Sequence, residues 1–203
     1  MTYMGDEMLV KGCQKGQLEA FEELIKKYEK KVYSLCYRYS GNYDDANDLA
    51  QEAFLKVYNS IDKFKGKSAF STWLYRVTAN VCLDEMRKQK KSPLSLDKPQ
   101  ETEEGEMYFS LPDQKYNPEV IAEKNDLRQL VHKGIGELPK EQRIIIILRE
   151  MEELSYEEIS EVLEISIGTV KSRLNRARKN LKEILSHNAE LFPTNTHLKN
   201  KEV

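Results

Sequence analysis

The sequence predicts an all-α protein in which a proline-rich and acidic segment separates two groups of helices. Three observations lead to this prediction. Apolar residues recur at steps of three and four along most of the chain, which is the period of amphipathic helices. Between residues 92 and 118 this period gives way to prolines and acidic residues. The composition, with 39% hydrophobic and 33% charged residues, is that of a soluble and helix-rich protein.

Composition also excludes several classes of protein. The 203 residues are enough for one or two domains with cores of their own. No apolar run approaches the roughly 18 residues that cross a bilayer, and the N-terminus lacks the basic and then apolar layout of a secretory signal. The cysteines, Cys13, Cys36 and Cys82, are odd in number, far apart and away from the histidines. We therefore expect a cytoplasmic protein without disulfides, metal or cofactor.

The N-terminal part is expected to begin with a short helix from about Asp6 to Lys15 and to continue with a long one from about Leu18 to Tyr39. The long helix carries an uninterrupted apolar stripe: Leu18, Phe21, Ile25, Tyr28, Val32, Leu35 and Tyr39. A stripe at this spacing is typical of a helix packed against other helices. We interpret its aromatic residues as core.

A third helix is expected after the turn-forming run at 40–42, with Asp44 or Asp45 as its N-cap. Its predicted inward face consists of Ala46, Leu49, Ala50, Ala53, Val57 and Ile61. Another side mixes acidic, polar and apolar residues: Asp48, Gln51, Glu52 and Leu55. Such a face either keeps the protein soluble or receives a basic partner helix, and the residues alone do not distinguish these roles.

Aromatic and basic residues alternate in the next segment. A loop is expected from Phe64 to Phe70, followed by a helix from about Ser71. One face of that helix is apolar, and another carries Arg76, Asn80 and Arg87. Rings that stack on bases, amides that read base edges and cations that bind phosphates suit single-stranded nucleic acid. The alternative is that Trp73 and Tyr75 are buried residues of a small domain.

The proline-rich segment cannot bury enough apolar surface to order itself, which predicts a flexible spacer.

A helix is then expected to begin at Asn117 and Pro118, an N-cap followed by a proline at the first helical position. Its apolar face consists of Leu127, Leu130, Val131 and Ile135. The helix expected after Pro139 contains five apolar residues in a row, at 144–148. We expect these two helices to brace the C-terminal motif.

The most specific local pattern lies between residues 154 and 181, where it predicts a helix-turn-helix. Ser155 and Glu158 have the spacing of a capping box, which marks a helix start. The helical period breaks at 164–166 and resumes in a second helix with the stripe Ile167, Val170, Leu174, Ala177, Leu181 and Ile184. The other faces of this helix are strongly basic, although the net charge of the chain is -2. This order of features favours a DNA-recognition helix over a solvated basic face.

Three motifs follow one another along the chain: DDANDLAQEAF, then FKGKSAFSTWLYRVTANVCLDEMRK, then LSYEEISEVLEISIGTVKSRLNRARKNL. Together they resemble the extracytoplasmic-function branch of the bacterial sigma-70 family, over about Asp6 to Leu185. The resemblance implies a promoter-specificity subunit of RNA polymerase, not an enzyme, built from two small helical domains joined by a flexible linker. The implied parts are a polymerase-binding and -10 domain at 1–92, an acidic linker at 93–117, a -35 helix-turn-helix domain at 118–186 and a disordered tail at 187–203.

The resemblance also implies site residues. The residues expected at the clamp helices of the polymerase's largest subunit are Asp48, Leu49, Gln51, Glu52 and the neighbouring Leu55. The residues expected to open the -10 element and capture a base from the non-template strand are Phe64, Phe70, Trp73, Tyr75, Arg76, Asn80 and Arg87. The residues expected to face the -35 element are Thr169, Lys171, Ser172, Arg173, Asn175, Arg176, Arg178 and Lys179. Three positions depart from residues common in the family: Lys171, Asn175 and Glu164, the last standing where many members have glycine.

The resemblance implies three partners. The first is core RNA polymerase, bound through the clamp helices of its largest subunit and the flap of its second largest subunit. The others are promoter DNA, which is duplex at -35 and single-stranded at -10, and an anti-sigma protein. In the family the linker threads the RNA-exit path, so the acidic segment has either that role or the role of a simple spacer. The nearest alternative is an ordinary helix-turn-helix regulator, which would not need the aromatic segment around Trp73. An enzyme is disfavoured, because no Glu-x-x-His pair, glycine-rich phosphate loop or Ser/His/Asp order is present.

Overall fold

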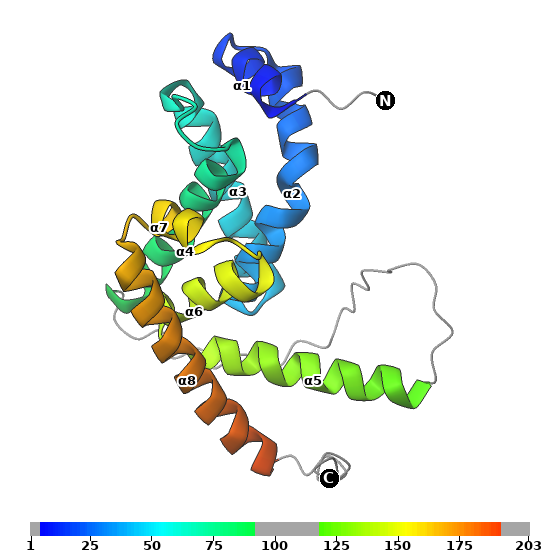
Figure 1. Cartoon of the computed structure of the whole chain (residues 1–203). Coiled ribbons are helices and arrows are strands. Elements are labelled where there is room, and N and C mark those ends of the chain that lie inside the picture. The colour runs from blue at the N-terminus through cyan, green and yellow to red at the C-terminus, as the bar shows by residue number, and fades with distance from the viewer. Residues whose placement is uncertain (1–4, 92–117, 192–203) are drawn as a thin grey trace.

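The computed structural model describes the backbone of residues 5–91 and 118–191, and the regular elements in these ranges are all helical (Figure 1). The first unit contains α1 (Asp6–Gln14), α2 (Leu18–Ser40), α3 (Tyr43–Ser60), the 3-10 turn η1 (Ile61–Lys63) and α4 (Phe70–Lys91). The second unit contains α5 (Pro118–Glu137), α6 (Lys140–Ile146), the π-helical turn η2 (Ile147–Met151), α7 (Tyr156–Leu163) and α8 (Ile167–Leu191). The all-α prediction is confirmed. None of the described helices is both long enough and apolar enough to cross a membrane.

Helix α1 closes one end of the first unit, whose core lies between α2, α3 and α4. The Tyr28 hydroxyl donates to the carboxylate of Asp6 at 2.6 Å, which fastens α1 to α2. The side-chain amide of Gln14 donates to the backbone carbonyls of Ile61 and Phe64, both at 3.0 Å. Helix α1 therefore also fixes the start of the loop that leads into α4.

The N-cap of α3 is Asn42, so the prediction of Asp44 or Asp45 was wrong. Gly41 ends α2 in the left-handed region at φ 89°, and Asn42 then adopts an extended conformation. Its side-chain oxygen accepts the backbone N–H of Asp45 at 2.8 Å. Both aspartates lie in the first turn of α3, where their charge interacts favourably with the positive end of the helix dipole.

The apolar run at 144–148 has no polar face because α6 and η2 lie inside the molecule. All five side chains are at most 1% exposed. Helix α6 packs on α8 of its own unit and also contacts α4, while η2 contacts α2. A helix with neighbours on every side is apolar all round. The uniform run is thus a consequence of its central position.

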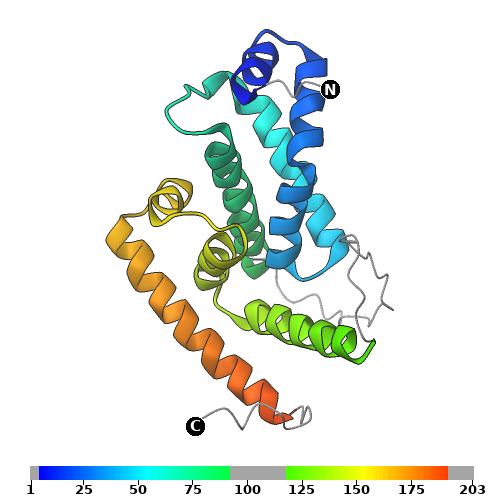
Figure 2. The same cartoon turned by 45° about the vertical axis from the view of Figure 1, so that its right-hand side comes forward.

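The two units are packed against each other. Figures 1 and 2 both show α7 beside α4, and α2 also contacts α5. Arg143 of α6, only 8% exposed, donates through Nη1 to the carbonyl of Tyr39 near the end of α2 at 2.8 Å. Its Nη2 donates to the carbonyls of Gly136 and Leu138 within the second unit. One buried guanidinium thus binds carbonyl oxygens from both units.

A second contact between the units pairs two rings. His132 of α5 stacks on Tyr37 of α2 with ring centroids 5.0 Å apart and planes at 24°. The Nε2 atom of His132 is buried and has no hydrogen-bond partner among the described atoms. Burial lowers the pKa of His132; a hydrogen bond with the backbone of Tyr37 opposes this, and the charges of Arg38 and Arg143 act in the same direction as burial.

Acidification is therefore expected to weaken the contact between the units. The pKa of His132 in the folded protein lies below 6.5, the usual pKa of a histidine. Above pH 6.5 this histidine therefore does not reduce the stability of the fold. As the pH falls from 6.5 toward the pKa of the folded state, stability is lost. Urea midpoints between pH 5 and 7 would measure this loss. In His132→Phe, which keeps a stacking ring but cannot titrate, the dependence should flatten; an unchanged dependence would assign it to other groups.

One boundary differs from the sequence-based expectation, and several expected segments lie outside the described residues. Helix α8 continues to Leu191, so the segment from 187 to 191 is helical and does not begin a disordered tail as expected. Helix α5 begins at Pro118 as expected, while its expected cap Asn117, the linker at 93–117 and the tail from 192 to 203 lie outside the described residues.

Candidate nucleic-acid interface

The predicted helix-turn-helix is formed by α7, a short turn and α8. Ser155 and Glu158 make the reciprocal hydrogen bonds of a capping box at the start of α7, as predicted. Glu164 ends α7 in the left-handed region, at φ 53° and ψ 43°. This region of backbone conformation favours glycine, and here a glutamate adopts it. Ser166 then accepts the backbone N–H of Thr169 at 3.1 Å, which caps the first turn of α8.

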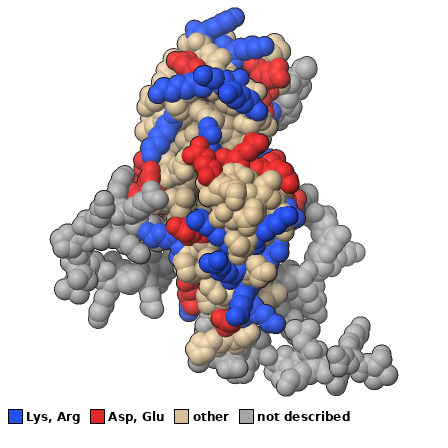
Figure 3. All heavy atoms as spheres, turned by 60° about the vertical axis from the view of Figure 1, so that its left-hand side comes forward, with Lys and Arg blue, Asp and Glu red and all other residues tan. Residues whose placement is uncertain are grey.

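The middle of the predicted apolar stripe of α8 is its buried face, with Val170, Leu174 and Ala177 at most 1% exposed. Leu181 and Ile184 are half-buried, and Ile167, at the start of the helix, is 38% exposed, contrary to its place in the stripe. Most of the residues predicted for the -35 element lie outside this stripe and are exposed: Lys171, Ser172, Asn175, Arg176, Arg178 and Lys179. The remaining two, Thr169 and Arg173, are half-buried. Figure 3 shows basic side chains gathered on the surface in the lower part of the view, where α8 lies.

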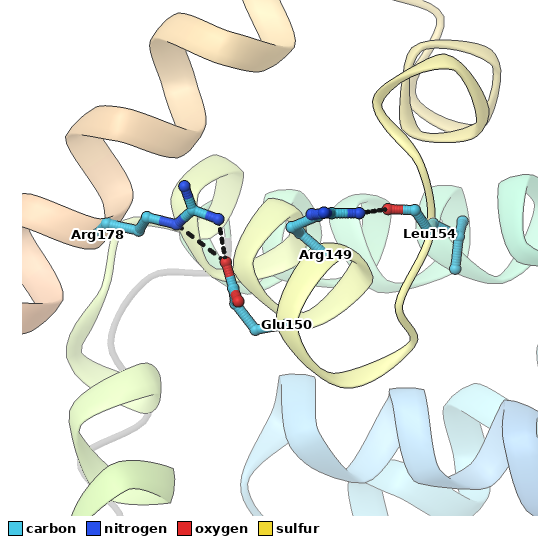
Figure 4. Close-up of polar contacts among 4 residues, drawn as sticks. All are labelled: Arg149, Glu150, Leu154 and Arg178. Atoms are coloured by element: carbon cyan, nitrogen blue, oxygen red, sulfur yellow. Dashed lines mark hydrogen bonds and ion pairs between the residues drawn. The ribbon is translucent and has the colours of Figure 1, made fainter.

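The basic side chains of α8 differ in whether they have partners. Arg178 donates through Nε and Nη2 to one carboxylate oxygen of Glu150, at 2.9 and 2.6 Å (Figure 4). This hydrogen bond raises the pKa of Arg178. Arg173 lies 3.5 Å from Glu141. Of the cations predicted for the -35 element, Lys171 and Arg176 have no such partner within the described ranges, so these two are the most available to DNA.

The aromatic residues of α4 are packed inside the first unit, in line with the alternative kept open for Trp73 and Tyr75. Trp73 and Tyr75 are each 8% exposed and Phe70 is 5% exposed. Phe64 and Phe70 flank the indole of Trp73, with ring centroids at 5.3 and 5.8 Å. A stacking role on bases therefore requires these rings to be uncovered first. The sequence left both roles open, because the same aromatic residue types serve as core residues and as rings that stack on bases.

The polar residues of α4 lie differently. Asn80 is exposed. Arg76 is half-buried and lies 3.3 Å from Glu164, at the end of α7. The side chain of Arg87 lies outside the described residues. Among the residues of the -10 set whose side chains are described, Asn80 is thus the one that is exposed to a base edge in this conformation.

The predicted polymerase-binding face of α3 is accessible except at one position. Leu49 is 5% exposed, so it packs in the core and does not contribute surface, contrary to its inclusion in the site. Asp48 and Gln51 are exposed, and Glu52 pairs with Lys56 at 3.0 Å. Leu55 is an apolar side chain that is 63% exposed.

One further residue of this face was missed. Tyr58 is 49% exposed, lies one turn after Leu55, and rests edge-on against the ring of Phe21 at 5.0 Å. Its spacing from Leu55 was the available signal, because residues three apart share a helix face. The exposed face of α3 thus has an acidic and polar half, at Asp48 and Gln51, and an apolar half, at Leu55 and Tyr58.

Glu152 is another residue that sequence reasoning missed. It follows η2, and its carboxylate accepts from Arg38 of α2 at 2.8 Å and from the Tyr75 hydroxyl of α4 at 2.7 Å. Only 8% of its side chain is exposed, whereas the neighbouring Glu153 is an exposed residue. Burial and the hydrogen bond to Glu152 raise the pKa of Tyr75 far above its usual range. Nothing in the local sequence distinguishes the two adjacent glutamates.

Comparison with known proteins places both units in one family. Residues 24–92 match the model of sigma-70 region 2, and residues 128–181 match that of sigma-70 region 4. The chain is 40% identical over 177 residues to the ECF RNA polymerase sigma factor SigW of Bacillus subtilis, covering 87% of this chain and 94% of that protein. It is 42% identical over 175 residues to the ECF RNA polymerase sigma-E factor of Escherichia coli K12, covering 86% and 91%.

Solved structures show the same fold. The complex of CnrH with the cytosolic domain of CnrY matches with a TM-score of 0.64 at 22% identity, covering 90% of this chain and 98% of the other. The sigma factor RpoE in complex with the anti-sigma factor NepR from Bartonella quintana matches with a TM-score of 0.61 at 27% identity, covering 82% and 96%. These matches span both units.

Proposed function

The chain belongs to the extracytoplasmic-function group of the sigma-70 family, and we propose from this premise how its surfaces divide the task of promoter recognition. A sigma factor of this group binds core RNA polymerase and directs it to promoters through their -10 and -35 elements. It is an initiation factor and not an enzyme. We assign core binding to the exposed face of α3, the -10 element to α4 and the -35 element to α8.

The observation that carries this assignment is the presence of two different interfaces on one chain. A helix-turn-helix alone fits any duplex-binding regulator. The exposed face of α3, with carboxylates beside Leu55, fits a protein partner and has no use in DNA binding, since its acidic residues would repel phosphates. A chain with both surfaces is suited to bring a protein to DNA.

The regulation and location of the protein follow from the same premise. The related RpoE structure contains a bound anti-sigma factor. We propose that this chain is likewise controlled by an anti-sigma protein, and that it acts in the cytoplasm, where polymerase and promoters are found.

Purified core polymerase tests the proposed function directly. The tagged chain should retain core polymerase in a pull-down, and the reconstituted complex should start transcription at promoters that core alone does not use. Free chain that binds a full promoter duplex tightly and selectively without polymerase would favour an ordinary helix-turn-helix regulator.

Two exposed cations of α8, Arg176 and Lys179, allow base reading to be separated from phosphate binding. Arg176 is exposed and its planar guanidinium can pair with guanine O6 and N7. Arg176→Ala is expected to cost about 1–3 kcal/mol and to relax preference at one -35 position. Lys179, 75% exposed and loosely paired with Glu183 at 4.0 Å, should act through phosphate. Lys179→Ala should weaken all promoters alike and lower the salt dependence by about one unit.

Transcription from a set of single-base -35 variants, at two salt concentrations, measures both effects. A uniform loss across all variants in Arg176→Ala would make Arg176 a phosphate contact. Base specificity would then be assigned to Lys171, Ser172 and Asn175, or to the shape of the DNA.

A groove between α5 and α8 is our candidate for the flap of the second largest polymerase subunit. The groove has a volume of about 600 Å³ and a largely apolar lining that includes Leu127, Leu130, Leu181 and Leu185. Leu127 is 60% exposed. The exposed Lys182 is also among the lining residues, so an amphipathic helix with an apolar face and acidic flanks would fit.

A further inference from the structure

Two arginines of α8 lie at the borders of its buried stripe. Arg173 follows the buried Val170 by three positions, and Arg178 follows the buried Leu174 by four. Residues at these spacings share one side of a helix. When a helix lies in the major groove, its outward side chains meet the bases, and cations beside them are placed to bind the phosphates that flank the groove. If they were free, Arg173 and Arg178 would therefore add phosphate contacts.

Carboxylates from outside α8 hold both arginines. Glu150, in η2, accepts from Nε and Nη2 of Arg178 at 2.9 and 2.6 Å (Figure 4). The hydroxyl of Tyr156, in α7, is a further hydrogen-bond partner of Arg178. A single contact of 3.5 Å joins Arg173 to Glu141 of α6. Arg178 is thus bound to groups of two other elements, and Arg173 is held more loosely.

Arg178 gains little by exchanging Glu150 for a phosphate. The side chain of Glu150 is 45% exposed. If Arg178 turned to a phosphate, this carboxylate would be left without its partner close to the same phosphate, and repulsion between the two anions would offset the new attraction. While the pair is intact its charges cancel, so that it neither attracts nor repels DNA. The geometry therefore favours an Arg178 that stays on Glu150 when α8 binds a duplex.

The contact between Glu150 and Arg178 affects the strength of DNA binding and not its sequence preference. A phosphate contact contributes equally at every sequence. Withholding Arg178 thus lowers the affinity of α8 for promoter and non-promoter duplex alike, while base reading stays with outward residues such as Lys171 and Arg176. The free chain is thereby kept off bulk DNA. A promoter is bound stably only where a further contact, such as that of α4 or of polymerase, adds to that of α8.

We propose that Glu150 is a positioning residue that withholds Arg178 from the DNA phosphates and so weakens duplex binding by α8. Arg178 is then a structural residue between α8 and η2, and not the -35 contact expected from the resemblance. Glu141 acts on Arg173 in the same way but more weakly. The proposal rests on the proposed function only where it concerns promoters. The withholding of Arg178 applies to any duplex, so the free chain tests it without polymerase.

Binding of the full chain to a labelled duplex without promoter sequence, measured by fluorescence anisotropy at several salt concentrations, tests the withholding. Glu150→Gln frees Arg178 to take up a phosphate. The slope of log affinity against log salt should therefore steepen by about 0.9, and the affinity at about 0.1 M salt should rise about tenfold. Glu161→Gln, the matched control, removes an exposed carboxylate from α7 and should change neither value. Glu141→Gln should give a smaller increase than Glu150→Gln.

The double variant Glu150→Gln/Arg178→Gln separates the two roles of Arg178, because it removes the ion pair without changing the net charge. If Arg178 makes no phosphate contact in the wild type, the salt slope of the double variant equals the wild-type slope. If Arg178 leaves Glu150 and binds a phosphate in the wild-type complex, the double variant loses about 0.9 from the slope. The second result overturns the proposal. So does a Glu150→Gln chain that remains folded by circular dichroism and binds duplex no more tightly than the wild type.

Transcription with the chain bound to core polymerase supplies the second arm. Glu150→Gln should strengthen all single-base -35 variants by the same factor, and the double variant should keep the wild-type order of preference. A changed preference at one -35 position in the double variant would make Arg178 a base contact and overturn the proposal. If the chain binds no core polymerase, the proposed function fails, while the anisotropy measurement still decides the role of Glu150.

Discussion

Replacing Leu55 with aspartate is expected to weaken core polymerase binding by about 2–4 kcal/mol and to leave the fold intact. Leu55 is 63% exposed, so a carboxylate there is solvated in the free protein. In the complex, the carboxylate would lose water at an apolar contact without gaining a partner, which costs several kcal/mol. Competition against labelled wild-type protein for core polymerase measures the loss.

Met8→Asp is the matched control, because Met8 is an equally exposed apolar residue, at 61%, on a different helix, α1. It should compete like the wild type. Leu127→Asp, in the groove between α5 and α8, tests the second polymerase contact independently. Normal competition by Leu55→Asp would remove α3 from the polymerase interface, and equal losses in Leu55→Asp and Met8→Asp would point to a general effect of added negative charge.

The largest loss of stability is expected from Arg143→Ala, at about 3 kcal/mol. The substitution leaves the carbonyls of Tyr39, Gly136 and Leu138 without their donor in a buried site, and it opens a cavity beside the ring of Tyr39. Burial also lowers the pKa of Arg143, as expected for a cation held mainly by neutral oxygens. Urea unfolding followed by circular dichroism measures the change.

Arg173→Ala serves as the comparison, since its side chain is 36% exposed and its ion pair with Glu141 is 3.5 Å long. Surface ion pairs of this kind are worth less than about 1 kcal/mol. Arg143→Lys should recover little, because an ammonium group lacks the planar array of donors that binds several carbonyls at once. Similar urea midpoints for Arg143→Ala and Arg173→Ala would show that the buried guanidinium contributes no more to the free energy of unfolding than a surface ion pair.

Much of the fold was predictable from local patterns. Three features depend on residues three and four positions apart: the stripe on α2, the capping box at Ser155 and the break before α8. Hydrogen bonds and packing at this short sequence separation can be read from the sequence. The cap of α3 shows the limit of this reasoning. Three cap-forming residues, Asn42, Asp44 and Asp45, stand almost together, and the left-handed turn at Gly41 decided that Asn42 is the one used.

The candidate site was predictable in its residue types but not in its exposure. Lys171, Arg176 and Asn80 are accessible as expected, whereas Leu49 is buried in the core of the first unit. The period of α3 already predicted Leu49 on the inward face and Leu55 on another side, and the burial of the two residues agrees with this. Leu49 was included in the site from the family motif, which runs along the sequence and does not follow one face of a helix. Exposure was undecided for Trp73 and Tyr75, and the packing of α4 buries both.

The sequence by itself determined the helices, their order and the family, because these depend on local periodicity and on motifs read along the chain. The tertiary structure alone decided how the two units meet. Glu152 pairs with Tyr75 and Arg38 across 77 and 114 positions of sequence, and the adjacent Glu153 pairs with neither. Contacts at such separations leave no local periodicity, since what selects one glutamate over its neighbour is the direction of the backbone between η2 and α7.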